Sequence, residues 1–313
     1  MSGAGRARGD APRPAARSVF VEAGGLRLHA LVDEPVATRP DRPELLVLHG
    51  FTGCAASMAG VALALAADAR VVRLELVGHG ASDAPAAPAL YAMAACAEQV
   101  GAAARALARA RPHLLGYSMG GRAALAAALA APEAFTSLIL IGATAGIADP
   151  AARAERIASD ERLALEIERD GLERFVDAWM EQPLFASQAR LGPEARARAR
   201  AERLAQRPHG LANSLRGMGA GAQLPLHDRL GELALPVLLV VGEADAKFRA
   251  IAAELARAIP HARVEVVPGA GHAAHLEAPD HFSAIVRAFL AEVGSAARAG
   301  RVATPAAEGG ARR

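Results

Sequence analysis

Residues 113–122 read HLLGYSMGGR and are followed by the alanine-rich run AALAAALAA. This stretch contains a G-x-S-x-G pattern centred on Ser118, between a short apolar run and a sequence of helical composition. The pattern is typical of a sharp strand-to-helix turn, where small residues let the two backbones approach each other. Such a turn places the serine hydroxyl above the sheet, at the positive N-terminus of the following helix. The stretch therefore predicts that Ser118 is a catalytic serine.

Short apolar runs alternate with helical sequence on both sides of this turn. This alternation is typical of an α/β fold with a mostly parallel, twisted sheet and helices on both faces. The expected strands are a hairpin over 18–32 and then 44–48, 71–76, 113–115, 137–141, 236–241 and 263–267, and the expected helices are 91–110, 119–131, 246–258 and 279–293.

One segment, 149–221, interrupts the alternation of strands and helices, because it contains charged helical sequence and no convincing strand. A helical insertion between two strands can cover the carboxyl edge of an open α/β sheet, where ligands bind. We expect it to be a lid, although its three or four helices could instead form a separate dimerisation element. The core then comprises 18–148 and 222–294. The small, polar, Gly- and Pro-bearing ends, 1–17 and 295–313, are expected to be disordered tails.

Two partners are needed, because a serine hydroxyl is a poor base or nucleophile until a histidine accepts its proton. In the α/β-hydrolase fold the order along the chain is Ser, then Asp or Glu, then His. Asp245 comes just after the run PVLLVVGE, and His272 follows RVEVVPGAG. Glu243 and His275 are the alternative acid and histidine. Asp245 lies further into its loop and His272 directly follows the PGAG turn, so we predict a triad of these two residues with Ser118.

A loop after the expected strand 44–48 reads HGFTG, residues 49–53. Such a loop supplies a backbone N–H, here from Phe51, which pairs with that of Met119 to form an oxyanion hole. We expect His49 to fix this loop rather than to react, and His79 in the turn GHG to be structural.

Composition argues against several other classes of protein. The formal net charge of +2 makes nucleic acid and an anionic membrane surface poor candidates for the main partner. Nearly all the positive charge is arginine, with Lys247 the only lysine. Neither Cys54 nor Cys96 lies in a catalytic context, and we find no metal-ligand spacing, dinucleotide fingerprint or phosphate loop, so no metal or organic cofactor is expected.

The expected location is the cytoplasm. No run approaches the roughly 18 apolar residues that a membrane span needs. The first residues lack the apolar segment of a secretory signal, and two cysteines imply no disulfide framework. No feature indicates an oligomeric state.

Several sequence strings outside the serine turn match the motifs of a single known family. The most particular is GLANSLRGMG at 210–219, accompanied by QPLF at 182–185, KFRAIAAELA at 247–256 and VPGAGHAAHLE at 267–277. Over roughly residues 44–291 the chain resembles the 2-succinyl-6-hydroxy-2,4-cyclohexadiene-1-carboxylate (SHCHC) synthases of menaquinone biosynthesis. The elbow and histidine motifs are shared widely across the α/β-hydrolase superfamily, whereas the string at 210–219 is specific.

The resemblance implies a lyase that eliminates pyruvate from 2-succinyl-5-enolpyruvyl-6-hydroxy-3-cyclohexene-1-carboxylate. Ser118 would remove a ring proton instead of attacking an ester carbonyl. It also implies a small polyanionic carboxylate substrate and no cofactor. By their place in the family's motifs, the implied substrate-binding residues are Tyr117, Arg122, Arg156, Trp179 and Arg207. The alternatives are that Arg156 is one of several exposed arginines and that Trp179 packs the lid.

The chain departs from the family pattern at three places. LELVGHG at 74–80 replaces the usual Asp-Leu-Pro before GHG, Ala220 stands where threonine is common, and His227 where tryptophan is frequent. These departures bear on the fit of the substrate. The alternative function is a serine hydrolase, either an esterase or a carbon–carbon-bond hydrolase, with the same triad. A non-catalytic binding protein on this scaffold would usually lack a triad member.

Overall fold

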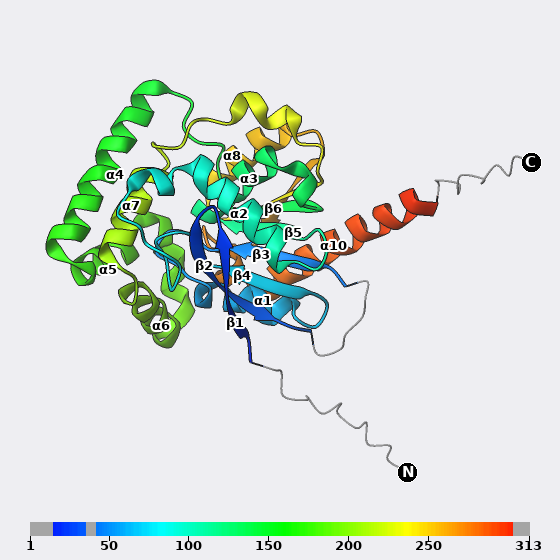
Figure 1. Ribbon diagram of the computed structural model, residues 1–313, viewed down its shortest axis with the longest axis horizontal. Coiled ribbons are helices and arrows are strands. Elements are labelled where there is room, and N and C mark those ends of the chain that lie inside the picture. The colour runs from blue at the N-terminus through cyan, green and yellow to red at the C-terminus, as the bar shows by residue number, and fades with distance from the viewer. Residues whose placement is uncertain (1–14, 36–41, 303–313) are drawn as a thin grey trace, which may run out of the picture.

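The structure is a computed structural model that describes residues 15–35 and 42–302 (Figure 1). Eight strands form one sheet in the order β1-β2-β4-β3-β5-β6-β7-β8. The first three of these, β1, β2 and β4, pair antiparallel, and all the other neighbours are parallel. The strands are β1 (Arg17–Ala23), β2 (Leu26–Asp33), β3 (Glu44–Leu48), β4 (Arg70–Leu74), β5 (His113–Tyr117), β6 (Ser137–Ile141), β7 (Val237–Gly242) and β8 (Ala262–Val267).

Helices cover both faces of the sheet, which is why every residue of β3, β4, β6 and β7 is buried. Successive residues of a strand point to opposite faces. Leu46 and Leu48 accordingly pack with α2 (Met93–Leu107), α3 (Met119–Ala130) and α8 (Ala246–Ala258). Leu45 and Val47 pack with α1 (Ala59–Leu65) and α10 (Pro279–Val302). The expected α/β class is confirmed, although sequence analysis did not identify α1.

Between β6 and β7 the chain forms a four-helix unit: α4 (Pro150–Asp170), α5 (Leu172–Met180), α6 (Gly192–Leu204) and α7 (Pro208–Met218), with a 3-10 segment over Pro183–Leu191. The start of α4 is capped, because the Asp149 carboxylate accepts the Ala152 N–H at 2.7 Å and Pro150 occupies the first helical position. The unit has an apolar cluster of its own that includes Ile167, Phe175 and Leu211. Figure 1 shows it to one side of the sheet.

The expected C-terminal boundary is wrong. Residues 295–302 continue α10, which ends at Val302 and projects from the body in Figure 1. Helix α10 is anchored by packing of Phe282, Val286 and Phe289, and extending an existing helix avoids the cost of a new nucleus. At the other end, β1 already begins at Arg17. The remainder of the two expected tails, 1–14 and 303–313, lies outside the described residues.

No helix in the described part of the chain is long and apolar enough to cross a membrane.

Candidate active site

Ser118 lies in the turn between β5 and α3, with a φ of +52°. This conformation is unfavourable for a residue with a side chain, and the close packing of small residues around it holds it in place. A Cβ on Gly116 would lie 2.3 Å from the Gly120 carbonyl oxygen. One on Gly120 would lie 2.4 Å from the carbonyl oxygen of His49. The glycines of the G-x-S-x-G pattern are therefore required by the contact between β5, α3 and the loop after β3.

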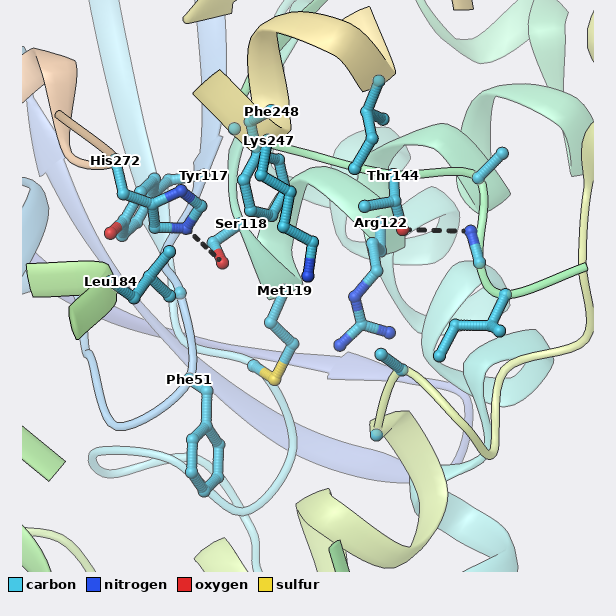
Figure 2. Close-up of a pocket in the computed structure, with 18 of the residues that line it drawn as sticks. Phe51, Tyr117, Ser118, Met119, Arg122, Thr144, Leu184, Lys247, Phe248 and His272 are labelled. Atoms are coloured by element: carbon cyan, nitrogen blue, oxygen red, sulfur yellow. Dashed lines mark hydrogen bonds between the residues drawn. The ribbon is translucent and has the colours of Figure 1, made fainter. Parts of the chain in front are cut away.

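The structure brings Ser118, His272 and Asp245 together. Ser118 Oγ lies 3.1 Å from His272 Nε2, the bond drawn in Figure 2, and His272 Nδ1 lies 2.9 Å from Asp245 Oδ2. The two alternatives lie elsewhere. Glu243 accepts the N–H of Gly269 at 2.8 Å. His275 is fully buried beside the Tyr117 ring, and burial lowers its pKa to about 3, so it is neutral.

The loop after β3 is held by two buried side chains. His49 Nδ1 lies 2.8 Å from the Gly50 carbonyl, and His49 Nε2 accepts the Leu76 N–H at 3.1 Å. Burial lowers the pKa of His49, which favours the neutral ring that these two bonds require. Glu75, one of the departures from the family pattern, accepts the N–H of Ala55 at 3.0 Å and contacts the His29 ring at 2.8 Å. These bonds fix the loop that contains Phe51.

A cavity of about 650 Å³ opens at the carboxyl edge of the sheet. Phe51, Met119, Ser118 and His272 all line it, so the predicted triad and oxyanion-hole residues meet at one site. Four cationic side chains also line the cavity: Arg122, Arg156, Arg203 and Lys247. Glu254 is the single carboxylate among the described lining residues. The cavity therefore combines a serine hydrogen-bonded to a histidine with an excess of positive charge.

Comparisons with known proteins identify the family. Residues 43–279 match the model of the alpha/beta hydrolase fold. A putative SHCHC synthase of Bacillus subtilis (strain 168) is 42% identical over 269 residues, which is 85% of this chain and 95% of that protein. The chain belongs to the SHCHC synthase family. A Salmonella schwarzengrund (strain CVM19633) SHCHC synthase is 34% identical over 254 residues, 81% of this chain and 95% of its own.

The fold of this family member agrees with that assignment. MenH from S. aureus superposes with a TM-score of 0.80 and 30% identity, covering 84% of this chain and 98% of that one. The expected fold class and the resemblance to SHCHC synthases are thereby confirmed.

Two of the expected binding arginines of this SHCHC synthase family member line the cavity. Arg122 is buried and donates to the Gln223 side-chain oxygen at 2.8 Å, but forms no ion pair with a described carboxylate. Burial, together with the charge of Arg156, lowers the pKa of Arg122 to about 10. Arg156 is half-exposed and pairs with Asp160 at 2.8 Å. Arg122 is thus a cation without an anionic partner, directly inside the cavity.

Trp179 and Tyr117 also line the cavity, but they differ in their packing and in the placement of their polar groups. Trp179 packs against Phe51, with ring centroids 5.3 Å apart, and its indole N–H is buried without a partner. An unpaired buried donor is costly unless a ligand satisfies it. The Tyr117 ring lies between His272 and His275, and its hydroxyl points away from Ser118 in Figure 2. Burial raises the pKa of Tyr117, which keeps the phenol neutral.

Arg207, the remaining expected binding residue, lies outside the cavity lining. Its guanidinium donates to the Ser82 carbonyl, joining the start of α7 to the loop after β4. Arg203, one helical turn earlier on α6, lines the cavity instead. Burial lowers the pKa of Arg203, and its Nε is buried without a partner. Sequence analysis missed Arg203 because the arginines of this segment recur too regularly to distinguish one from another.

The departures from the family pattern also fall partly in the cavity. Ala220 and His227 line it, while Glu75 lies in the support of the loop after β3. Lys247 lines the cavity as well. In the sequence it begins the string KFRAIAAELA and is the only lysine of the chain. Among the described residues, no group of three or more His, Cys, Asp or Glu side chains is placed to hold a metal ion.

Proposed function

We propose that the protein is an SHCHC synthase, a lyase that eliminates pyruvate from 2-succinyl-5-enolpyruvyl-6-hydroxy-3-cyclohexene-1-carboxylate. The observation that carries this proposal is the cavity in which Ser118 and His272 face four cationic side chains. The substrate has three carboxylates, one each on the ring, the succinyl group and the enolpyruvyl group. Arginine binds carboxylates with two parallel hydrogen bonds. The cavity suits this ligand because Arg122 and Arg203 lack a carboxylate partner among the described residues, while Arg156 is paired with Asp160.

The reaction begins with the removal of a proton from the ring. The ring hydrogen beside the succinyl ketone is acidic because its removal gives an enolate. Ser118 Oγ takes this proton while His272 accepts the serine's own, and Asp245 holds the imidazole in the tautomer that allows it. The negative charge that develops on the ketone oxygen is stabilised by the N–H groups of Phe51 and Met119.

The second half of the reaction is the departure of enolpyruvate. The electron pair forms a new ring double bond, the existing double bond shifts, and the bond from carbon to the enolpyruvyl oxygen breaks. Enolpyruvate then becomes pyruvate in water. The elimination consumes no water, and its electrons balance within the substrate.

The four-helix unit of residues 149–221 serves as the lid in this proposal. Arg156 on α4, Trp179 on α5 and Arg203 on α6 line the cavity from this unit, while Ser118 and Arg122 line it from the core. We expect substrate or product to protect the unit from proteolysis. Equal cleavage with and without ligand would count against a closing lid.

The test is pyruvate release from the enolpyruvyl substrate, generated in place by the preceding synthase. The substrate also eliminates pyruvate without an enzyme, so a reaction lacking the protein sets the background. We expect Ser118→Ala to lose about 10²–10⁴-fold of the enzymatic rate. The matched control is Ser295→Ala, because Ser295 is exposed on α10 and donates to the Ala291 carbonyl of its own helix. Wild-type release no faster than the background would refute the proposal.

A further inference from the structure

Lys247 stands out in this chain by its residue type. It is the only lysine among 35 lysines and arginines, and it lines the cavity that contains Ser118. Every other basic position is arginine, including the three other cations of the cavity. A position that required only positive charge would be filled equally well by arginine.

Local stability does not explain the position of Lys247. It lies in the first turn of α8, where the helix dipole is positive and a cation is unfavourable. Within the described ranges 15–35 and 42–302, the Lys247 side chain forms no hydrogen bond and no ion pair. Its Nζ lies 5.9 Å from the centroid of the Phe248 ring. Lys247 is exposed and lines the cavity, so an ammonium group placed against the dipole and without a carboxylate partner is free to meet a ligand there.

The triad itself sets the position of Lys247. Asp245 receives the His272 Nδ1–H with one oxygen, and with the other it accepts the Phe248 N–H at 3.2 Å, which begins α8. Lys247 is therefore held two residues from the triad acid, on the same turn. Figure 2 shows its ammonium group pointing into the cavity, on the same side as Ser118 and Arg122.

We propose that Lys247 protonates the departing enolpyruvyl oxygen, an inference that rests on the proposed function. As the bond from carbon to this oxygen breaks, the oxygen receives the bonding pair and an Nζ proton. Enolpyruvate leaves, His272 releases the proton that it accepted to solvent, and the neutral amine takes up a proton from solvent. Each enzyme turnover thus moves one proton from the ring to Ser118 and His272 and another from Lys247 to the leaving group.

The other donors of the cavity are poorly suited to this step. Arginine is the weakest acid among the cationic side chains, which disfavours Arg156 and Arg203 as proton donors. Burial lowers the pKa of Arg122 to about 10, but its guanidinium is held by a hydrogen bond to Gln223. Tyr117 points its hydroxyl away from Ser118. His272 Nε2 faces Ser118 Oγ, at the ring carbon that loses its proton, whereas the departing oxygen is bound to the carbon across the ring. His227 also lines the cavity, but it is not on the turn that Asp245 holds beside the triad. Lys247 is the cation on that turn that can both neutralise the leaving oxygen and give it a proton.

The experiment compares Lys247→Ala with Lys247→Arg, measured as pyruvate release above background. The Arg variant keeps the charge and removes the exchangeable acid. We expect both variants to lose about 10²-fold or more in kcat. Added methylamine or ethylamine should restore Lys247→Ala at least about tenfold, in proportion to the amine concentration, and should leave Ser118→Ala unchanged.

The control is Arg249→Ala on the same helix, because Arg249 is exposed and its guanidinium donates to the Glu243 carbonyl. It should retain wild-type release, and the thermal midpoints of all variants should agree within a few degrees. Near-wild-type kcat in Lys247→Arg would show that only charge matters and would overturn the proposal. Lack of rescue by any amine would also overturn it. Wild-type release equal to the background would instead refute the proposed function, and with it the role of Lys247.

Discussion

Asp245 accepts the Nδ1–H of His272 at 2.9 Å with one carboxylate oxygen while the other oxygen caps helix α8. A single side chain thus orients the imidazole and fixes the start of the helix that contains Lys247. The two roles respond differently to substitution, because asparagine caps helices about as well as aspartate but cannot accept the Nδ1–H with its amide nitrogen.

Asp245→Asn is therefore expected to lose activity with little loss of stability. The amide reverses the hydrogen bond and selects the wrong imidazole tautomer, so kcat for pyruvate release should fall about 10²–10⁴-fold. Asp245→Ala should lose similar activity and, in addition, about 1 kcal/mol of unfolding free energy through the missing cap. Steady-state kinetics and urea unfolding measure the two effects. An Asn variant with wild-type kcat would show that Asp245 does not orient His272.

Substitution of Arg203 is expected to weaken substrate binding, whereas substitution of Arg207 is expected to lower stability. Arg203→Met removes a half-buried cation from the cavity, and we expect kcat/KM to fall by about 30-fold or more, equivalent to about 2 kcal/mol or more of binding. Arg207→Met removes the contact with Ser82 and should lower the unfolding midpoint while changing kcat/KM less than about threefold. Arg169→Met, an exposed substitution on α4, is the control for both. The opposite ranking of the two variants would restore the prediction made from sequence.

The turn around Ser118 should not tolerate a methyl group at Gly120. Gly120→Ala places a Cβ 2.4 Å from the His49 carbonyl oxygen, so α3 must move away from the loop after β3, with a cost of about 1–3 kcal/mol and a loss of activity. Gly60→Ala on α1 is the matched control, since no atom lies within 4 Å of its Cβ. It should be neutral or stabilise by up to about 1 kcal/mol. Equal stability of the two variants, measured by urea unfolding, would contradict the tight packing of the turn.

Buried neutral histidines should make the protein less stable in acid. Burial lowers the pKa of His79 and His275 to about 3 and that of His113 to about 4. In the unfolded chain these groups titrate near 6.5, so below that pH the unfolded state binds protons that the folded state does not. Their stabilising contribution is complete above about pH 6.5 and is lost as the pH falls toward 4.

His113→Asn isolates one of these groups, because His113 begins β5 at the far end of the strand from Ser118. Between about pH 6 and 4.5, the variant's unfolding free energy should fall less steeply than that of wild type, by about 1.4 kcal/mol per pH unit. Urea unfolding at several pH values measures the slope, and pyruvate release at neutral pH should not change. Identical slopes would show that His113 is not buried as the neutral form.

The fold and the triad could be predicted from the sequence because their signals are local and ordered. The G-x-S-x-G pattern requires glycines at fixed positions, and Asp245 and His272 each follow a recognisable apolar strand. The order of Ser, acid and histidine along the chain then allows few alternatives.

The direction in which a helical side chain points could not be predicted from the local sequence. Whether Arg203 or Arg207 reaches the cavity depends on how α6 and α7 pack on the core, which helical periodicity alone does not determine. The same holds for α10, where packing of its first half carries the helix to Val302. Both differences from the expectations arose where tertiary contacts decide the outcome and the local sequence is rich in alanine and arginine.

The central claim is elimination by proton removal, and the mass spectrum of the products formed in H₂¹⁸O tests it most directly. We expect one pyruvate for each substrate consumed and an intact ring product lighter than the substrate by the mass of pyruvic acid. This product should contain no oxygen incorporated from solvent during turnover, because Ser118 forms no acyl intermediate for water to attack. Release of succinate with ¹⁸O in its carboxylate would contradict the claim and identify a carbon–carbon-bond hydrolase that uses the same serine, histidine and aspartate.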